Sequence, residues 1–261
     1  MSKAPRVVNL GLPKSGTTTL AKALHRGGFK VADWMVREED GRKRGFVGRL
    51  MYLGYFESGD PLQFMKDRDA FTEISVVRRG RNYWPQMDWA LLDAIRKHHP
   101  GTKFMLSMRD PAKHADSMRR WSNLGRTRLP ENHIPGLPML HGDEPGEIER
   151  WIEGHITFCR RVFRDDPDFF EYEIEDEQAR EKISAHIGVD LPWWGQANVN
   201  VNKKADGEDA APEHPLQEPP AKPSVPEPPA AKTAPAKTTS AKPHKIAVRL
   251  AKTKPNKEDR E

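Results

Sequence analysis

Arg6-Val-Val-Asn-Leu-Gly-Leu-Pro-Lys-Ser-Gly-Thr-Thr18 is the stretch of sequence that decides the fold. Residues 6–12 are typical of a short buried strand, which Pro13 ends. From Gly16 onward, apolar residues recur at helical spacing as far as residue 24, and a glycine pair at 27 and 28 closes the pattern. The stretch therefore predicts a strand, a tight loop and a helix, in that order.

The loop in this unit has the features of a phosphate site. Backbone N–H groups of such a loop and of the following helix N-terminus converge on an anion, and the helix dipole adds to the attraction. Gly16 lets the backbone approach closely, while Thr17 and Thr18 offer hydroxyl donors in the first turn. We expect a bound phosphate group here; the alternative is a simple capped turn between strand and helix.

The same loop differs from the Walker A motif of ATP and GTP hydrolases. Walker A consists of Gly, any four residues and then Gly-Lys-Ser/Thr, so its lysine follows the second glycine. Gly11 and Gly16 have the required separation, but Thr17 occupies the lysine position and Lys14 lies inside the loop. The loop is therefore a poor match to a Mg-nucleotide hydrolase.

Further strands and helices alternate along the chain. Hydrophobic periodicity predicts strands at 71–77, 103–108 and 169–174, and helices at 84–99, 111–121, 147–164 and 177–187. Strands that alternate with helices form a mostly parallel sheet covered on both faces. The sequence thus predicts an α/β, P-loop-type three-layer fold with a mostly parallel sheet between helices.

The C-terminal part of the chain has a different composition. About half of the 23 prolines lie after residue 203, in a stretch without any aromatic residue. Such a segment cannot bury enough apolar surface to offset its ordering entropy. We predict a folded domain at 1–202 and a disordered Ala/Pro/Lys-rich tail at 203–261. The tail is either a solvated extension or a basic arm for an unknown anionic partner.

Charge, cysteine content and hydrophobic patterning indicate the class of partner and the cellular compartment. A net charge of +5 and a pI near 9.2 favour anionic partners without indicating a specific nucleic acid. Cys159 is the only cysteine, which excludes an intramolecular disulfide, and its helical surroundings predict a buried thiol. Residues 1–6 lack the apolar region of a signal peptide, and no apolar run reaches the roughly 20 residues that span a bilayer. We predict a cytoplasmic protein without a membrane span.

The phosphate loop resembles a known pattern. Its sequence is similar to the 5'-phosphosulfate loop of sulfotransferases that use 3'-phosphoadenosine-5'-phosphosulfate (PAPS). The resemblance implies that Lys14 contacts the oxygen that bridges phosphate and sulfate. It also implies that Ser15, Gly16, Thr17 and Thr18 hold the 5'-phosphate, and that Pro13 belongs to the cofactor-binding loop.

The same resemblance predicts a second motif, an arginine at the end of a later strand and a serine in the following helix. Arg109 directly follows the strand at 103–108, Pro111 starts a helix, and Ser117 stands eight residues after Arg109, at the expected spacing. A guanidinium fork suits a dianionic phosphate, and a hydroxyl donor fixes its orientation. The resemblance therefore implies that Arg109 and Ser117 bind the 3'-phosphate, with a structural ion pair as the alternative role of Arg109.

The likeness extends over most of the chain. Segments at 69–73, 100–104 and 191–200 also resemble this family, in particular its bacterial members, so the likeness covers roughly residues 6–203. The chain departs from the better-known cytosolic enzymes after that, because no Arg-Lys-Gly segment follows to complete the 3'-phosphate site. The candidates to replace it are Asn202, Lys203 and Lys204.

The resemblance implies an in-line displacement without a metal ion. Lys14 would stabilise the charge on the leaving oxygen, while a base takes the proton from an acceptor hydroxyl or amine. Glu73 is the first candidate for this catalytic base, and an ion pair with Arg78 or Arg79 is the alternative for its side chain. The other candidate bases are Asp33, His98 and His99.

The acceptor is expected to be a small metabolite or a glycan. Segments 36–68 and 122–146 are rich in Arg, Gly and Pro, and such loops often shape a binding pocket. Two other functions stay open. One is a P-loop small-molecule kinase that uses ATP and Mg²⁺, and the other is a non-catalytic nucleotide-binding module.

Overall fold

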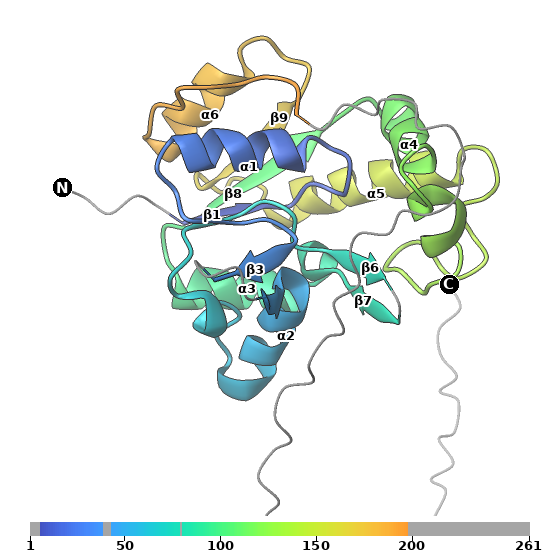
Figure 1. Cartoon of the computed structure of the whole chain (residues 1–261), viewed down its shortest axis with the longest axis horizontal. Helices are drawn as coiled ribbons and strands as arrows, with labels where there is room; N and C mark the ends of the chain where they lie inside the picture. Colours follow the sequence, from blue (N-terminus) through green and yellow to red (C-terminus); the bar gives the residue numbers. More distant parts are fainter. Residues whose placement is uncertain (1–5, 39–42, 79, 198–261) are drawn as a thin grey trace, which may run out of the picture. The chain divides into compact units, whose positions relative to one another are not determined.

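A five-stranded sheet lies at the centre of the computed structural model, which describes residues 6–38, 43–78 and 80–197 (Figure 1). Neighbouring strands all run parallel, in the order β2-β5-β1-β8-β9. Their bounds are Val7–Asn9 (β1), Val31–Ala32 (β2), Ala70–Phe71 (β5), Lys103–Met108 (β8) and Phe169–Glu173 (β9). The predicted three-layer α/β fold is confirmed.

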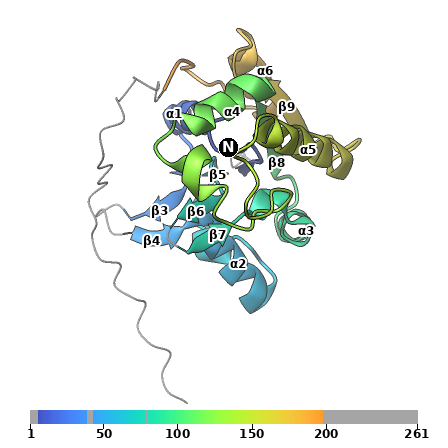
Figure 2. The same cartoon turned by 90° about the vertical axis from the view of Figure 1, so that its right-hand side faces the viewer.

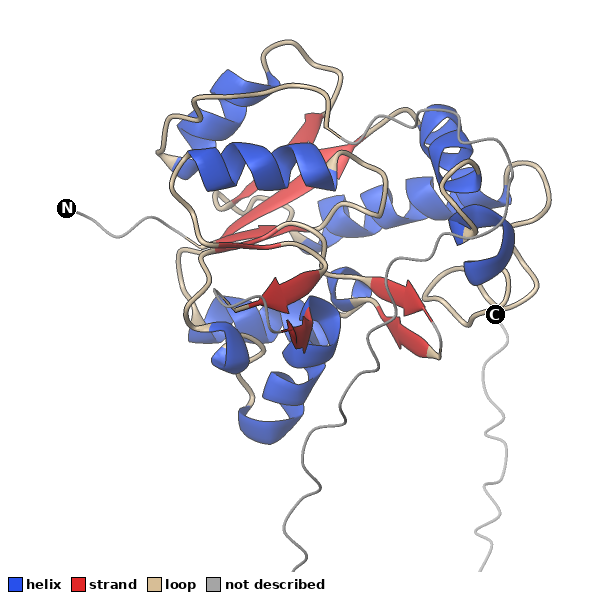
Figure 3. Cartoon of the chain, viewed as in Figure 1, coloured by secondary structure: helices blue, strands red, loops and turns tan. Residues whose placement is uncertain are grey.

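Helices cover both faces of this sheet, as Figures 1 and 3 show. Helices α1 and α6 pack on one face, and α2, α3 and α5 pack on the other. Side chains alternate along each strand, so Val7 and Met105 join the first core while Val8 and Phe104 join the second. The bounds are Thr17–Arg26 (α1), Val47–Ser58 (α2), Trp89–His98 (α3), Glu147–Val162 (α5) and Ala179–Ile187 (α6).

The predicted strand at 71–77 is wrong as a single element. Strand β5 ends at Phe71, and the chain then leaves the sheet after one more hydrogen bond, from Thr72 N to Ala32 O. It resumes as β6 (Val76–Arg78), which pairs in an antiparallel hairpin with β7 (Arg81–Tyr83). A second hairpin joins β3 (Met35–Arg37) to β4 (Lys43–Phe46). The break after β5 places Glu73 beyond the carboxyl end of the sheet.

The carboxyl ends of β1 and β8 lie side by side, because these two strands are neighbours. Helix α4 (Pro111–Arg119) follows β8, with Asp110 accepting a hydrogen bond from Lys113 N at 2.9 Å as its N-cap. A π-helical turn, η3 (Leu124–Arg128), comes next. In Figure 2, α1, α4 and α5 lie around this end of the sheet. Open α/β sheets bind their ligands beyond the carboxyl ends of the strands.

Several other predictions concern single residues or the tail. Cys159 is buried as predicted, and burial raises the pKa of its thiol. Within the described residues, no helix combines the length and the apolarity that crossing a membrane requires. The predicted tail, the boundary at 202/203 and the residues Asn202, Lys203 and Lys204 lie outside the described residues.

Candidate functional site

The phosphate loop has the backbone that its sequence predicts. Gly16 has a φ of 90° and is the N-cap of α1, and Lys14 has a φ of 74°, which is uncommon for a residue with a side chain. The first α1 hydrogen bond runs from Leu20 N to Gly16 O, so the N–H groups before it have no partner within the helix. No acidic residue lies in the first turn of α1. The helix end is therefore shaped to receive an anion.

A buried polar network supports the loop from below. Ser15 Oγ lies 2.6 Å from Ser107 Oγ, and Asn9 Nδ2 donates to Ser107 Oγ at 3.2 Å. A Cβ atom on Gly11 would lie 1.9 Å from Ser107 Oγ, so this position requires glycine. Since Ser107 belongs to β8, the Ser15 side chain fixes the loop to that strand. Ser15 N also donates to Leu12 O, which closes a turn within the loop.

Two buried histidines, which sequence reasoning missed, fix the loop carbonyl groups. His114 Nε2 lies 2.8 Å from Pro13 O, and His155 Nε2 lies 2.7 Å from Leu10 O. Burial lowers the pKa of each imidazole to about 4, so both are neutral at physiological pH and donate through Nε2. Their partners belong to distant parts of the chain, and no local pattern announced them.

Lys14 lies over an aromatic ring, in a contact that sequence reasoning also missed. Its Nζ is 3.4 Å from the centroid of the Trp121 ring, a cation–π distance. The pKa of Lys14 falls to about 8, mainly through burial. The negative charge of Glu73 opposes this fall, and the positive charges of Arg109 and Arg120 add to it. These charges therefore gather around one loop.

Glu73 lies beside the same loop. Thr17 Oγ1 donates to Glu73 Oε2 at 2.9 Å. Burial raises the pKa of the Glu73 carboxyl, and the nearby charge of Asp33 raises it further. The hydrogen bond from Thr17 and the charges of Lys14 and Arg128 act in the opposite direction. Such a carboxylate, partly desolvated and close to a lysine, is suited to accept a proton.

The rival positions for the base are less well placed. His99 Nε2 lies 2.7 Å from Asp60 Oδ1, and its Nδ1 lies 2.9 Å from the guanidinium of Arg6, which precedes β1. His99 is therefore at the amino end of the sheet, opposite the loop. Asp33 lies near Glu73 but is 3.1 Å from Arg37 in an ion pair. Glu73 forms no ion pair with Arg78 in the part of the chain described, and Arg79 lies outside that part.

The second predicted motif lies at the adjacent strand end. Arg109 follows β8, with its Nε 3.3 Å from Glu175 Oε1, and Lys113 Nζ is 2.7 Å from Glu175 Oε2. Ser117 is buried within α4. The charge of Arg109 lowers the pKa of both Lys14 and His114, so the two predicted motifs lie at the same carboxyl end of the sheet. Arg109 thus forms the ion pair that the sequence left open as its alternative role, and it lies close enough to Lys14 for its charge to act there.

Two further arginines, Arg120 and Arg128, add positive charge near the loop. Arg120 follows α4, and its charge lowers the pKa of Lys14. Arg128 ends η3, donates to Val77 O at 3.2 Å and acts on Glu73. These residues fit a doubly phosphorylated ligand, because Lys14, Arg109 and Arg120 bring positive charge close to the loop that precedes the N-terminus of α1. Among the residues with assigned positions, no three His, Cys, Asp or Glu side chains gather as a metal ion would need.

The comparisons with known proteins bear on this site. A family model described as a sulfotransferase domain matches residues 6–187, a span that includes the loop, Glu73, Arg109 and Ser117. No curated protein matches the chain.

Proposed function

Since the chain belongs to the sulfotransferase domain family, whose model covers residues 6–187, it is an enzyme of sulfuryl transfer, and we propose that PAPS is its donor. The observation that supports this proposal is that Lys14 and Arg109 lie near each other at the carboxyl end of the sheet, beside the N-terminus of α1. PAPS has anionic groups at both the 3' and the 5' positions of its ribose, and each group is stabilised by a nearby cation. We further propose a small-molecule or glycan acceptor.

Each residue of the site has a proposed task. PAPS supplies the sulfuryl group. The loop N–H groups and Thr18 bind the 5'-phosphate, while Arg109 and Ser117 bind the 3'-phosphate. Lys14 compensates the negative charge on the oxygen that leaves sulfur, and Glu73 takes the proton of the acceptor hydroxyl as the new sulfur–oxygen bond forms. Thr17 holds Glu73 in place through its hydroxyl.

The donor can be tested by thermal denaturation with 3',5'-adenosine bisphosphate, the nucleotide product. At about 100 times its Kd, a ligand stabilises the folded state by about 2.7 kcal/mol, equivalent to an increase in Tm on the order of 5–10 °C for a domain of this size. We expect this increase without Mg²⁺ and little change with Mg-ATP. Stabilisation by Mg-ATP alone would instead favour the kinase function.

Arg109→Ala is the matched variant for the same measurement. Truncating one side of a charge pair costs about 2 kcal/mol or more, which is at least a ~30-fold loss of affinity. The ligand-induced increase in Tm, taken from the variant's own baseline, is then expected to shrink to about a third. Arg164→Ala, an exposed arginine beyond α5, is the control and keeps the full increase. An unchanged increase in the Arg109 variant would remove this residue from the donor site.

Trp121 is proposed to position Lys14. A cation–π contact is worth about 0.5–2 kcal/mol, so Trp121→Leu is expected to lower kcat by about 2- to 30-fold. Leucine keeps the surroundings of Lys14 apolar but removes a contact that favours the charged form, so the pKa of Lys14 is expected to fall and the alkaline loss of activity to move to lower pH. Trp121→Phe keeps a ring and is the control. A pH profile of sulfate transfer that is identical in Trp121→Leu and the parent would contradict this role.

A further inference from the structure

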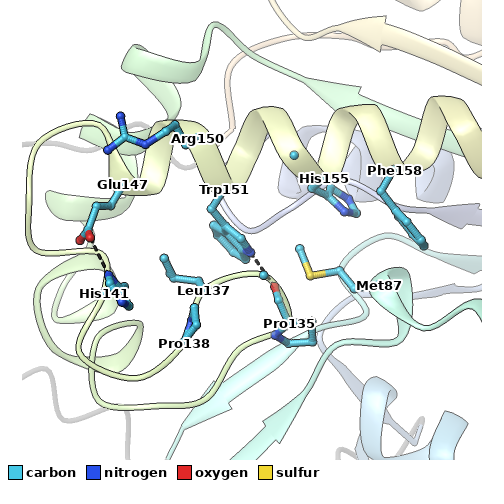
Figure 4. Close-up of a pocket in the computed structure, with 12 residues that line it drawn as sticks. Met87, Pro135, Leu137, Pro138, His141, Glu147, Arg150, Trp151, His155 and Phe158 are labelled. Carbon is cyan, nitrogen blue, oxygen red and sulfur yellow. Dashed lines mark hydrogen bonds and ion pairs between the residues drawn. The ribbon is translucent and has the colours of Figure 1, made fainter.

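A cavity of about 560 Å³ lies between helix α5 and the loop at 135–141, with Met87 closing a third side (Figure 4). Its size is within the range of small-molecule sites. None of the residues proposed to bind the nucleotide or to react lines it. The predicted pocket-forming segment 122–146 thus contributes to this cavity, whereas 36–68 does not. The apolar side chains of the lining are Met87, Pro135, Leu137, Pro138, Trp151 and Phe158.

One wall of the cavity is fixed before any ligand arrives. Trp151 is buried, and its Nε1 donates to Pro135 O at 2.8 Å, so its polar group is already satisfied. Its ring meets that of Trp84 edge-on, with the centroids 5.5 Å apart. The indole is therefore held from two sides. Together with the proline rings it offers a flat, rigid, apolar surface, which suits a flat ring in the ligand.

Gly154 is the most informative residue of the lining. It lies in the middle of the 16-residue helix α5, where glycine costs about 1 kcal/mol relative to alanine. A Cβ atom there would meet nothing within 4 Å, so neighbouring atoms do not require a glycine. What the missing side chain preserves is the open space of the cavity. The sequence thus gives up helix stability where a side chain would enter the cavity.

The outer end of the cavity is polar. His141 Nδ1 lies 2.6 Å from Glu147 Oε1, and Gly142 N donates to Glu147 Oε2 at 2.6 Å. Arg150 also lines this end. Hydrogen-bond donors and acceptors are thus both present, which suits a hydroxyl group. At the inner end, His155 lines the cavity while donating to Leu10 O, so a bound molecule would contact a residue that fixes the phosphate loop.

We infer that this cavity binds a small molecule with an apolar, flat ring and a hydroxyl group. The ring lies against Trp151 and Phe158, and the hydroxyl faces the end formed by His141, Glu147 and Arg150. The site is separate from the nucleotide-binding residues, and its occupancy does not depend on the proposed donor. Because its hydroxyl faces the outer end of the cavity, away from Lys14 and Glu73, such a molecule is not placed to accept the sulfuryl group; it is an effector that acts through His155.

The probe is 2-naphthol, titrated into the full-length protein by calorimetry in the presence of 3',5'-adenosine bisphosphate. We expect saturable binding to one site. Gly154→Leu fills the cavity and is expected to weaken binding at least tenfold. Gly154→Ala is the matched control; it leaves room for the ring, raises Tm through its better helix propensity and retains binding. Circular dichroism confirms that both variants fold.

Two results would overturn the inference: no saturable binding to the parent protein, or equal binding to the parent and to Gly154→Leu. A site elsewhere on the surface would give the second result. A parallel assay with radiolabelled PAPS separates this effector role from that of an acceptor. Naphthol that binds without being sulfated supports the effector role, whereas sulfated naphthol that is lost in Gly154→Leu would contradict it. Failure of the donor proposal would appear in the nucleotide titration and would leave the naphthol isotherm unchanged.

Discussion

Replacing Lys14 by alanine is expected to lower kcat for sulfate transfer by about 10²–10³, the effect of removing one preorganised group that stabilises transition-state charge. Lys14 belongs to the loop and its ammonium is held over the Trp121 ring, where we expect it to stabilise the charge that develops on the leaving oxygen. The loop N–H groups and Arg109 are untouched by the substitution. The Kd of 3',5'-adenosine bisphosphate is therefore expected to change far less than kcat.

The pH dependence provides a second measurement on the same residue. The pKa of Lys14 is lowered to about 8, so its side chain is charged below that pH and neutral above it. Activity that needs the charge is expected to fall as the pH rises through about 8, and Lys14→Arg should lose this alkaline limb because guanidinium stays charged. Lys22→Ala, on the exposed side of α1, is the control. A loss of nucleotide affinity equal to the loss of kcat would contradict the proposed role.

The first unit of the fold was predictable because its signals are local. A strand, a glycine-containing loop and a helix follow each other within residues 6–26, and Pro111 with Asp110 marks the start of α4 equally clearly. Helix α2 was missed for a physical reason. A Cβ atom on Gly48 would lie 2.5 Å from Ile74 O, and one on Gly54 would lie 2.4 Å from Asp60 O. Close packing thus demands residues that weaken the local helix signal.

The site was predictable only where its residues follow strand ends. Arg109 comes directly after β8, and Lys14 lies in the loop that follows the neighbouring parallel strand β1, so their proximity follows from topology. Trp121, His114 and His155 are different, because their partners are the side chain or carbonyl groups of the loop more than 100 residues away in the sequence. Such contacts depend on how α4 and α5 pack, which hydrophobic periodicity does not specify.

Glu73 lies between these two cases, and its chemistry follows from the break in the predicted strand. Had residues 71–77 formed one strand, Glu73 would have paired within the sheet. Instead the chain leaves the sheet after Phe71, and the carboxyl group lies beside Thr17 and within reach of the Lys14 charge. Burial raises its pKa, so the side chain holds a proton to higher pH than an exposed glutamate does.

Glu73→Gln is expected to lower kcat by about 10²–10⁴, the range for removal of a general base. The amide keeps the shape of the side chain and can still accept the hydrogen bond from Thr17. In the parent protein, activity should fall as the pH falls through the raised pKa of Glu73, because only the carboxylate accepts a proton. The variant should lack this acidic limb while retaining affinity for 3',5'-adenosine bisphosphate.

Stability supplies an independent test of the same carboxyl group. A glutamate with a raised pKa in the folded state contributes most to stability below its unfolded pKa, and that contribution is lost as the pH rises through its folded pKa. Glu73→Gln should therefore have a higher Tm than the parent at neutral pH, with the difference vanishing in acid, whereas exposed Glu57→Gln should show neither change. A residue that serves as a base is kept charged at the expense of stability. A Glu73→Gln variant that is less stable at pH 7 and fully active would show instead that Glu73 is a structural partner of Thr17.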